Sequence, residues 1–202
     1  EFISEELPPP SSPKKLEYLN AAYGDELVKI AREHPEIVGL DADLVLDTGL
    51  IPFKKEFPER YIECGIAEQD MVSIAGGLAL RGLLPVVHSF ACFLSTRPNE
   101  QIYNNATERT KIIYTASLAG LLPSTPGHSH QSVRDISCLG SVPGLIMIQP
   151  SCEEETRLAI RWAVEKNRES TYIRICNIPA QISYVLPEGY ELELGKGVFL
   201  NE

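Results

Sequence analysis

The sequence predicts a doubly wound α/β domain with a mostly parallel sheet of about six strands and helices on both faces. Apolar runs of strand length alternate along the chain with segments whose apolar residues recur every three or four positions. This alternation is typical of βαβ units, in which helices cover both faces of a parallel sheet. With 44% hydrophobic residues among 202, the chain is long and apolar enough for one domain with a full core.

The elements are expected in the following order. Leu19, Tyr23, Leu27 and Ile30 share one helical face, and this first helix is expected to end near His34. Six apolar runs are expected to form the strands, at residues 37–40, 60–64, 85–90, 111–117, 144–150 and 171–176.

Further helices are expected between these strands, at 67–82, at 94–106 and just before Val142. Ser151 is followed three residues later by Glu154, the spacing of a capping box, which predicts that the last helix begins there. Residues 1–15 combine a proline run with serine and charge and lack apolar periodicity, so we expect a Pro-rich linker or arm.

The charge and the cysteines limit the partners and the compartment. The chain has 28 acidic against 18 basic residues and a net charge of -10, which disfavours nucleic acid and anionic membrane surfaces as partners. No segment approaches the roughly 18 consecutive apolar residues of a membrane span. The five cysteines are odd in number and form no C-x-x-C pair, as expected of reduced thiols in a cytoplasmic protein.

In a doubly wound sheet the ligand crevice lies outside the carboxyl ends of the strands, so the loops that follow strands are where chemistry is expected. Glu68 lies in such a position, although taken alone it could simply complement a helix dipole. Phe90 and Phe93, spaced i, i+3, could be ordinary core residues, and His128 and His130 lack a third metal ligand nearby. The chain has no G-x-G-x-x-G after a strand, no Walker A loop and no G-x-S-x-G elbow.

Three stretches, read together, resemble the transketolase family, in particular its central pyrimidine-binding domain. They are KKEFPERYIECGIAEQDMVSIAGGLALRG, SFACFLSTRPNEQI and GHSHQSVRDISCLGSVPGLIMIQPS, and the resemblance runs in order from about Leu16 to Pro179. The string IECGIAEQ and the F-x-x-F-x-x-x-R block are its most specific parts. Deoxyxylulose phosphate synthases and 2-oxo acid dehydrogenases share the domain, but YIECGIAEQDMVSIA looks most like the transketolases.

The resemblance implies a thiamine diphosphate enzyme. Glu68 matches the glutamate that hydrogen-bonds the pyrimidine ring nitrogen and so helps to remove the proton from the thiazolium carbon, which makes it catalytic as well as cofactor-binding. Phe93 matches the aromatic residue on which the pyrimidine stacks, with Phe90 beside it. His130 matches a catalytic and cofactor-binding position that is His or Gln in the family, and Asp43 matches an acidic residue beside the thiazolium end.

The departures from the family pattern concern the substrate. The positions that match two arginines and a serine holding the sugar phosphate are Asn20, Asn177 and Asp47, and an aspartate there would repel phosphate. A substrate-binding histidine of the family is replaced by Ser117, and an aspartate of its E-D-G-P motif by Pro126. We therefore expect transfer of a two-carbon ketol unit with a substrate pocket rebuilt away from the usual sugar phosphates.

The resemblance also implies partners. The family holds the diphosphate and Mg²⁺ through a G-D-G…N motif on a separate domain, so no metal ligands are assigned to this chain, and a homo- or hetero-oligomer with a diphosphate-binding domain is expected. The expected pyrimidine-binding domain is 16–180, and 181–202 would extend towards the third domain that family members carry. Two alternatives remain: the beta-type subunit of a 2-oxo acid dehydrogenase or decarboxylase, and a non-catalytic interaction subunit of the same fold.

Overall fold

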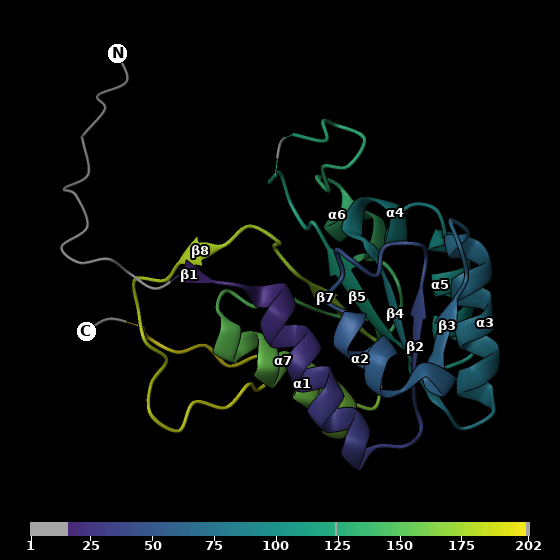
Figure 1. Cartoon of the computed structure of the whole chain (residues 1–202). Helices are drawn as coiled ribbons and strands as arrows, with labels where there is room; N and C mark the ends of the chain where they lie inside the picture. Colours follow the sequence, from purple (N-terminus) through teal and green to yellow (C-terminus); the bar gives the residue numbers. More distant parts are fainter. Residues whose placement is uncertain (1–15, 124, 201–202) are drawn as a thin grey trace.

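The structure is a computed structural model that describes residues 16–123 and 125–200, so the predicted arm at 1–15 lies outside the described residues. Its centre is a six-stranded sheet in the order β3-β2-β4-β5-β7-β6 (Figure 1), and every pair in it is parallel. All six predicted strands are therefore confirmed. They are β2 (Ile37–Asp41), β3 (Tyr61–Glu63), β4 (Leu84–Phe90), β5 (Ile113–Ser117), β6 (Ile146–Ile148) and β7 (Thr171–Arg174).

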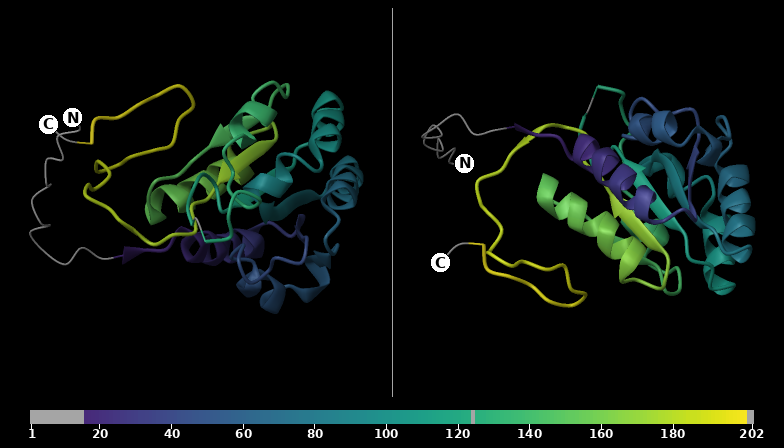
Figure 2. Two further views of the ribbon diagram at one scale, coloured as in Figure 1. Left: turned by 90° about the horizontal axis from the view of Figure 1, so that it is seen from above. Right: turned by 60° about the horizontal axis from the view of Figure 1, so that its bottom comes forward.

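Helices cover both faces of the sheet, as predicted. α1 (Leu19–Glu33) and α7 (Glu153–Glu165) pack side by side on one face, and α3 (Glu68–Leu80) and α5 (Asn99–Thr107) cover the other (Figure 2). Four short helical elements complete the domain: α2 (Ile51–Glu56), the 3-10 turn η1 (Pro58–Arg60), α4 (Ala91–Leu94) and α6 (Asp135–Leu139). None of the described helices is long and apolar enough to cross a membrane.

Two expectations about the helices are wrong in detail. The single helix predicted over 94–106 is divided into α4 and α5, with Pro98 immediately before α5, because proline lacks the N–H that a continuous helix needs there. The predicted capping box at Ser151 is shifted by one residue. Cys152 is the N-cap, with Glu155 N donating to its Sγ at 3.4 Å, and the Glu155 carboxylate bonds back to Ser151 N at 2.8 Å.

The first helix is fixed to the sheet by a buried polar contact. The Tyr23 hydroxyl lies 2.8 Å from His88 Nε2 on β4 and accepts a hydrogen bond of 2.9 Å from Thr115 Oγ1 on β5. Burial lowers the pKa of His88 to about 4, so the imidazole is neutral at pH 7. These contacts set the register of α1 along β4 and β5.

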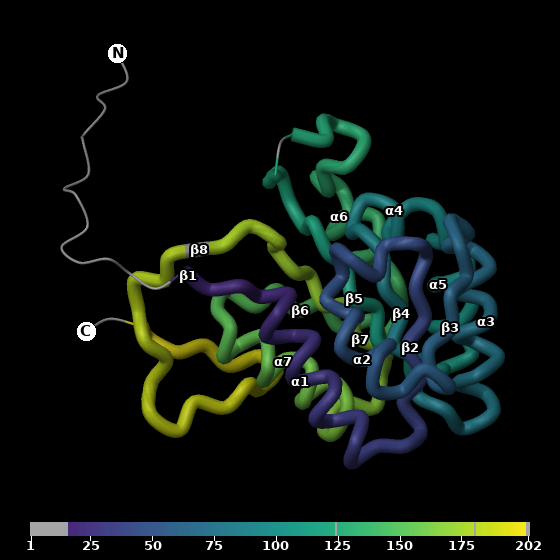
Figure 3. The backbone as a smooth tube through the Cα atoms, in the orientation of Figure 1, coloured from purple at the N-terminus to yellow at the C-terminus, as the bar shows by residue number. Residues whose placement is uncertain are grey.

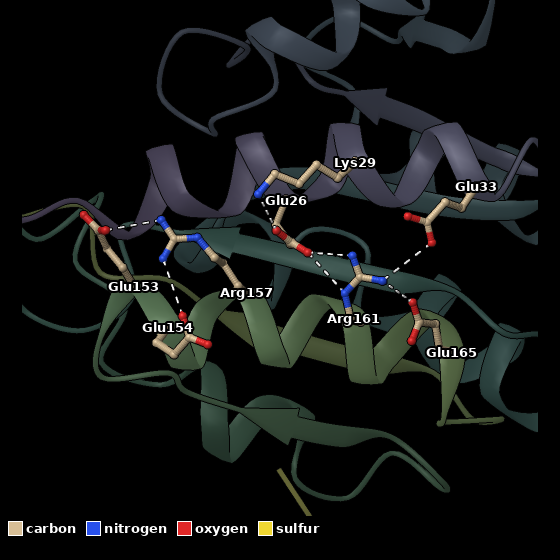
Figure 4. A network of polar contacts seen from close by, with 8 residues as sticks. All are labelled: Glu26, Lys29, Glu33, Glu153, Glu154, Arg157, Arg161 and Glu165. Atoms are coloured by element: carbon tan, nitrogen blue, oxygen red, sulfur yellow. Dashed lines mark hydrogen bonds and ion pairs between the residues drawn. The ribbon is translucent and has the colours of Figure 1, made fainter. Parts of the chain in front are cut away.

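Ion pairs join α1 to α7 around the buried carboxylate of Glu26 (Figure 4). Arg161 of α7 donates to Glu26 of α1 at 2.7 Å and to Glu165 on its own helix at 2.6 Å, and Lys29 adds a second cation to Glu26 at 3.1 Å. Among the described residues, one group of side chains could in principle hold a metal ion. It lies at the end of α1 and consists of Glu33, His34 and Glu165. Because Arg161 already lies beside both carboxylates of this group, we assign it no metal.

The first described residues pair with a segment that follows the last strand of the sheet, beside the domain (Figure 3). β1 (Leu16–Glu17) pairs antiparallel with β8 (Ala180–Gln181), a ladder that the sequence did not predict. Residues 182–200 then run without helix or strand past α7, where the Tyr190 hydroxyl donates to Glu155 at 3.1 Å.

The strand order places the ligand crevice. From β2 the chain passes to β3 on one side and then to β4 on the other, so the direction of winding reverses between β2 and β4. Ligands of doubly wound sheets bind outside the carboxyl ends of the strands at such a switch point. The carboxyl ends here are Asp41 of β2 and Phe90 of β4.

Candidate cofactor site

Glu68 is a buried carboxylate beside the switch point. It is the first residue of α3, where the helix dipole favours a negative charge, and only 2% of it is exposed. Its Oε1 accepts a hydrogen bond of 2.7 Å from Arg97 Nη1 and one of 3.3 Å from Ser89 Oγ. Among the described residues no hydrogen bond reaches Oε2, so the carboxylate keeps one oxygen for a ligand.

Three rings form an aromatic cluster next to this carboxylate. Phe90 ends β4 and Phe93 lies in α4, with ring centroids 5.8 Å apart. His130, on the loop that follows β5, packs with its centroid 5.1 Å from Phe93 and 6.0 Å from Phe90. Ser129 Oγ lies 2.9 Å from His130 Nδ1, which leaves Nε2 of the ring for other partners.

Arg97 joins the carboxylate to the cluster. Its guanidinium lies 3.8 Å from the centroid of the Phe93 ring while it pairs with Glu68. Sequence reasoning placed Arg97 in the F-x-x-F-x-x-x-R block without giving it a role. The sequence feature that could have predicted its contact with Phe93 is their four-residue spacing. The backbone is helical here, since Arg97 N donates to Phe93 O at 2.9 Å, and residues four apart in a helix lie on the same face.

Asp43 lies at the same edge of the sheet but is not joined to this group. Its backbone is left-handed, with φ of 62°, and its N donates to Glu63 Oε1 at 2.9 Å. Its side chain is exposed, and no described contact joins its carboxylate to Glu68, Phe93 or His130. The neighbouring Leu44 packs against the hydrophobic group of Phe90, Cys92 and Leu118 and so brings this loop to the cluster.

Asp41, which sequence reasoning passed over, holds the start of that loop. It is fully buried at the end of β2, and its carboxylate accepts from Leu44 N at 2.6 Å and from Thr48 Oγ1 at 3.3 Å. Burial, with a contribution from the charge of Glu63, raises the pKa of Asp41 to about 6.

The residues at the substrate positions also come together. Asn20 Nδ2 and Asn177 Nδ2 donate to the same main-chain carbonyl, that of Asp47, at 2.7 Å and 2.9 Å. Ser117, at the end of β5, is buried, whereas Pro126 and His128 are exposed on the following loop. The structure thus groups Asn20, Asp47 and Asn177, and no described contact joins Pro126 to them.

Fold and site together define a doubly wound α/β domain with a buried carboxylate and an aromatic cluster at its switch point, which is a cofactor-binding class. Residues 18–178 match the family model described as "Transketolase, pyrimidine binding domain". The chain therefore belongs to the transketolase pyrimidine-binding domain family, as the sequence motifs predicted.

The similar proteins are of two kinds, 1-deoxy-D-xylulose-5-phosphate synthases and transketolases. A 1-deoxy-D-xylulose-5-phosphate synthase of Clostridium botulinum is 34% identical over 203 residues, which cover 91% of this chain and 33% of that protein. A putative transketolase C-terminal section of Methanocaldococcus jannaschii is 33% identical, covering 90% of this chain and 58% of that protein. A solved structure titled as a split gene transketolase, inactive beta4 tetramer, is similar with a TM-score of 0.78 and 33% identity, covering 92% of this chain and 58% of that one. The chain thus spans about a third of the synthase and somewhat over half of the transketolase section and of the split gene transketolase chain.

Proposed function

We propose that this chain supplies the pyrimidine-binding half of a thiamine diphosphate-dependent enzyme that transfers a two-carbon ketol unit. The observation that carries the proposal is Glu68, a buried carboxylate with Oε2 uncommitted beside the rings of Phe90, Phe93 and His130. Membership of the family and the likeness to a split transketolase support it. The findings do not favour a 2-oxo acid dehydrogenase subunit or a non-catalytic subunit.

These residues fit the flat pyrimidine ring of the cofactor. When bound, thiamine diphosphate supplies the carbanion centre that ketol transfer needs. Glu68 would hold a proton between its Oε2 and the pyrimidine ring nitrogen, because burial and the first turn of α3 fix the carboxylate in place. Phe93 and Phe90 would stack against the ring, and such contacts contribute about 1 kcal/mol beyond area burial.

His130 and Asp43 take the remaining roles in the proposal. His130 would bind substrate or move a proton at Nε2, since Nδ1 lies against Ser129. Asp43 would lie beside the thiazolium end, as its place on the loop after β2 allows.

A diphosphate-binding domain, on this polypeptide or on another, would complete the site and carry the Mg²⁺. Large apolar side chains exposed around the edge of the site support such a partner: Ile66 is 73% exposed, Leu46 79%, Val133 67% and Leu121 61%. The assembly would be a dimer or hetero-oligomer in the cytoplasm, a compartment supported by five cysteines that are all unpaired.

The synthase relatives give a second candidate. Their identity of 34% is no lower than the 33% of the transketolase section, so synthesis of 1-deoxy-D-xylulose 5-phosphate is to be tested beside ketol transfer. Product analysis of the assembled enzyme separates the two reactions.

The decisive experiment replaces Glu68 in the chain assembled with its diphosphate-binding domain, thiamine diphosphate and Mg²⁺. Proton exchange at C2 of the cofactor, followed by NMR, should fall by about 100-fold or more in Glu68→Gln, because the amide cannot exchange a proton with the ring nitrogen. Asp70→Asn is the matched control, since Asp70 is exposed in the same first turn of α3. Unchanged exchange in a Glu68→Gln enzyme that still binds cofactor would refute the proposal.

A further inference from the structure

A loop is pressed against the N-terminal half of α1 at the edge of the candidate site. A Cβ at Gly24 would lie 2.1 Å from Gly49 O, and one at Gly49 would lie 2.5 Å from Asn20 O. Gly49 also has φ of 78°, which favours glycine. Only glycine at both positions allows this approach, so the loop from Asp43 to Gly49 is fixed on α1.

Two amides close the end of the loop from either side. Asn20 of α1 and Asn177, which follows β7, both donate to the Asp47 carbonyl, at 2.7 Å and 2.9 Å. Asn177 Oδ1 also accepts from Leu118 N at 2.8 Å, which ties in the segment after β5. We call this arrangement of Asn20, Asp47, Leu118 and Asn177 the amide wall.

The amide wall adjoins the aromatic cluster. Leu118 packs against Phe90 and Cys92, with Phe93 beside them. In the sheet, Phe90 of β4 is the register partner of Ser117 of β5. A substrate that reacts beside Phe93 therefore has the amide wall within reach of one end.

The amide wall carries no positive charge. Its donors are neutral amides, and the side chains of Asp43 and Asp47 are exposed on the same loop. Two buried polar atoms here have no hydrogen-bond partner among the described residues, Asn20 Oδ1 and Ser117 Oγ. Ser117 lies two residues beyond Thr115, which contacts Tyr23, and Asn20 lies three residues before Tyr23, so both occupy the same face of the sheet.

We propose that the amide wall selects substrates whose end beside it is uncharged and hydroxylated, and excludes a phosphate group there. The inference rests on the proposed function, since ketol donors and acceptors carry hydroxyl groups. A hydroxyl can donate a hydrogen bond to an amide oxygen such as Asn20 Oδ1, whereas a fully ionised phosphate has no proton to donate. A phosphate would also meet the exposed Asp43 and Asp47 carboxylates, which would repel it.

The test compares matched acceptors in the assembled enzyme with cofactor and Mg²⁺. With one ketose donor, kcat/KM for glyceraldehyde is expected to exceed that for glyceraldehyde 3-phosphate by at least about 10-fold. Asp47→Lys keeps the main-chain carbonyl of the amide wall but reverses the exposed charge, and it should move the preference about 10-fold towards the phosphorylated acceptor. Glu108→Lys makes the same charge reversal at an exposed position. Because Glu108 precedes β5, it lies towards the amino ends of the strands, and this variant should leave the preference unchanged.

The outcomes separate the inference from the proposed function. A preference for the phosphorylated acceptor, or formation of 1-deoxy-D-xylulose 5-phosphate, overturns the substrate inference while Glu68-dependent C2 exchange still supports a thiamine diphosphate site. A preference that Asp47→Lys and Glu108→Lys shift equally also overturns it, because general surface charge would then explain the effect. If proton exchange at C2 does not depend on Glu68, the proposed function itself is refuted.

Discussion

Two arginine–carboxylate pairs at the carboxyl end of the sheet use the same chemistry in different ways. Asp135 is 1% exposed and Arg174 8%, and the guanidinium contacts both carboxylate oxygens, at 2.6 Å and 3.1 Å. Tyr172 donates to Asp135 as well, and Gln149 accepts from Arg174. Glu68 is just as buried, but Arg97 is 37% exposed and reaches one oxygen only.

The difference teaches how a function can be recognised in a buried ion pair. The Asp135–Arg174 pair is saturated, and it fixes α6 and the loop before it to β7. Among the described residues, the Glu68–Arg97 pair leaves one carboxylate oxygen and most of the guanidinium N–H groups without a hydrogen bond, next to rings that could hold a ligand. A saturated pair stabilises the fold, whereas an unsaturated pair at a switch point is suited to binding.

The largest effect is expected at the saturated pair. Asp135→Ala leaves the Arg174 guanidinium buried without its counter-ion, which should lower the free energy of unfolding by about 3–5 kcal/mol. Chemical denaturation followed by circular dichroism measures this loss. A decrease below about 1 kcal/mol would show that the pair is less enclosed than its geometry indicates.

A buried carboxylate without an arginine partner sharpens the comparison. The pKa of Asp41 in the folded protein, about 6, lies above its ordinary value of 3.8. The folded state therefore binds this proton more tightly than the unfolded chain does. Its contribution to stability is complete below about pH 3.8 and is lost as the pH rises through 6. Asp41→Asn should remove this pH dependence, which is on the order of 2 kcal/mol, in unfolding measured between pH 4 and about 7. An identical pH profile in the variant would contradict the assignment.

The smallest effect on stability, but a distinct one on activity, is expected at Arg97. Arg97→Met leaves the buried Glu68 carboxylate without its cation, but Ser89 Oγ and the first turn of α3 still stabilise the negative charge, so the change should cost about 1–2 kcal/mol in unfolding free energy. Cofactor C2 exchange in the assembled enzyme should nevertheless fall about 10-fold, since Glu68 loses the donor that orients it. Arg97→Lys, which keeps the charge, should recover part of the exchange. Equal and large losses of stability in Arg97→Met and Asp135→Ala would abolish the distinction between the pairs.

The sequence was sufficient for the strands because their apolar runs reflect burial on both faces of a parallel sheet. It was insufficient for short elements such as α2, whose six residues are too few for a helical period, and for the break at Pro98. The motifs identified Glu68, Phe93 and His130 as candidates. The contacts of Arg97 with Glu68, 29 residues away, and of Asp135 with Arg174, 39 residues away, exist only once the sheet is assembled.

The β1–β8 ladder brings the start and the end of this domain next to each other. Leu16 pairs with Gln181, so the chain enters and leaves the domain at neighbouring points, whatever precedes or follows it. A domain with adjacent ends can be inserted into a longer polypeptide or encoded apart from its neighbours without disturbing its core. The same geometry suits both kinds of relative found here, those in which the domain is a third of one long chain and those in which the gene is split.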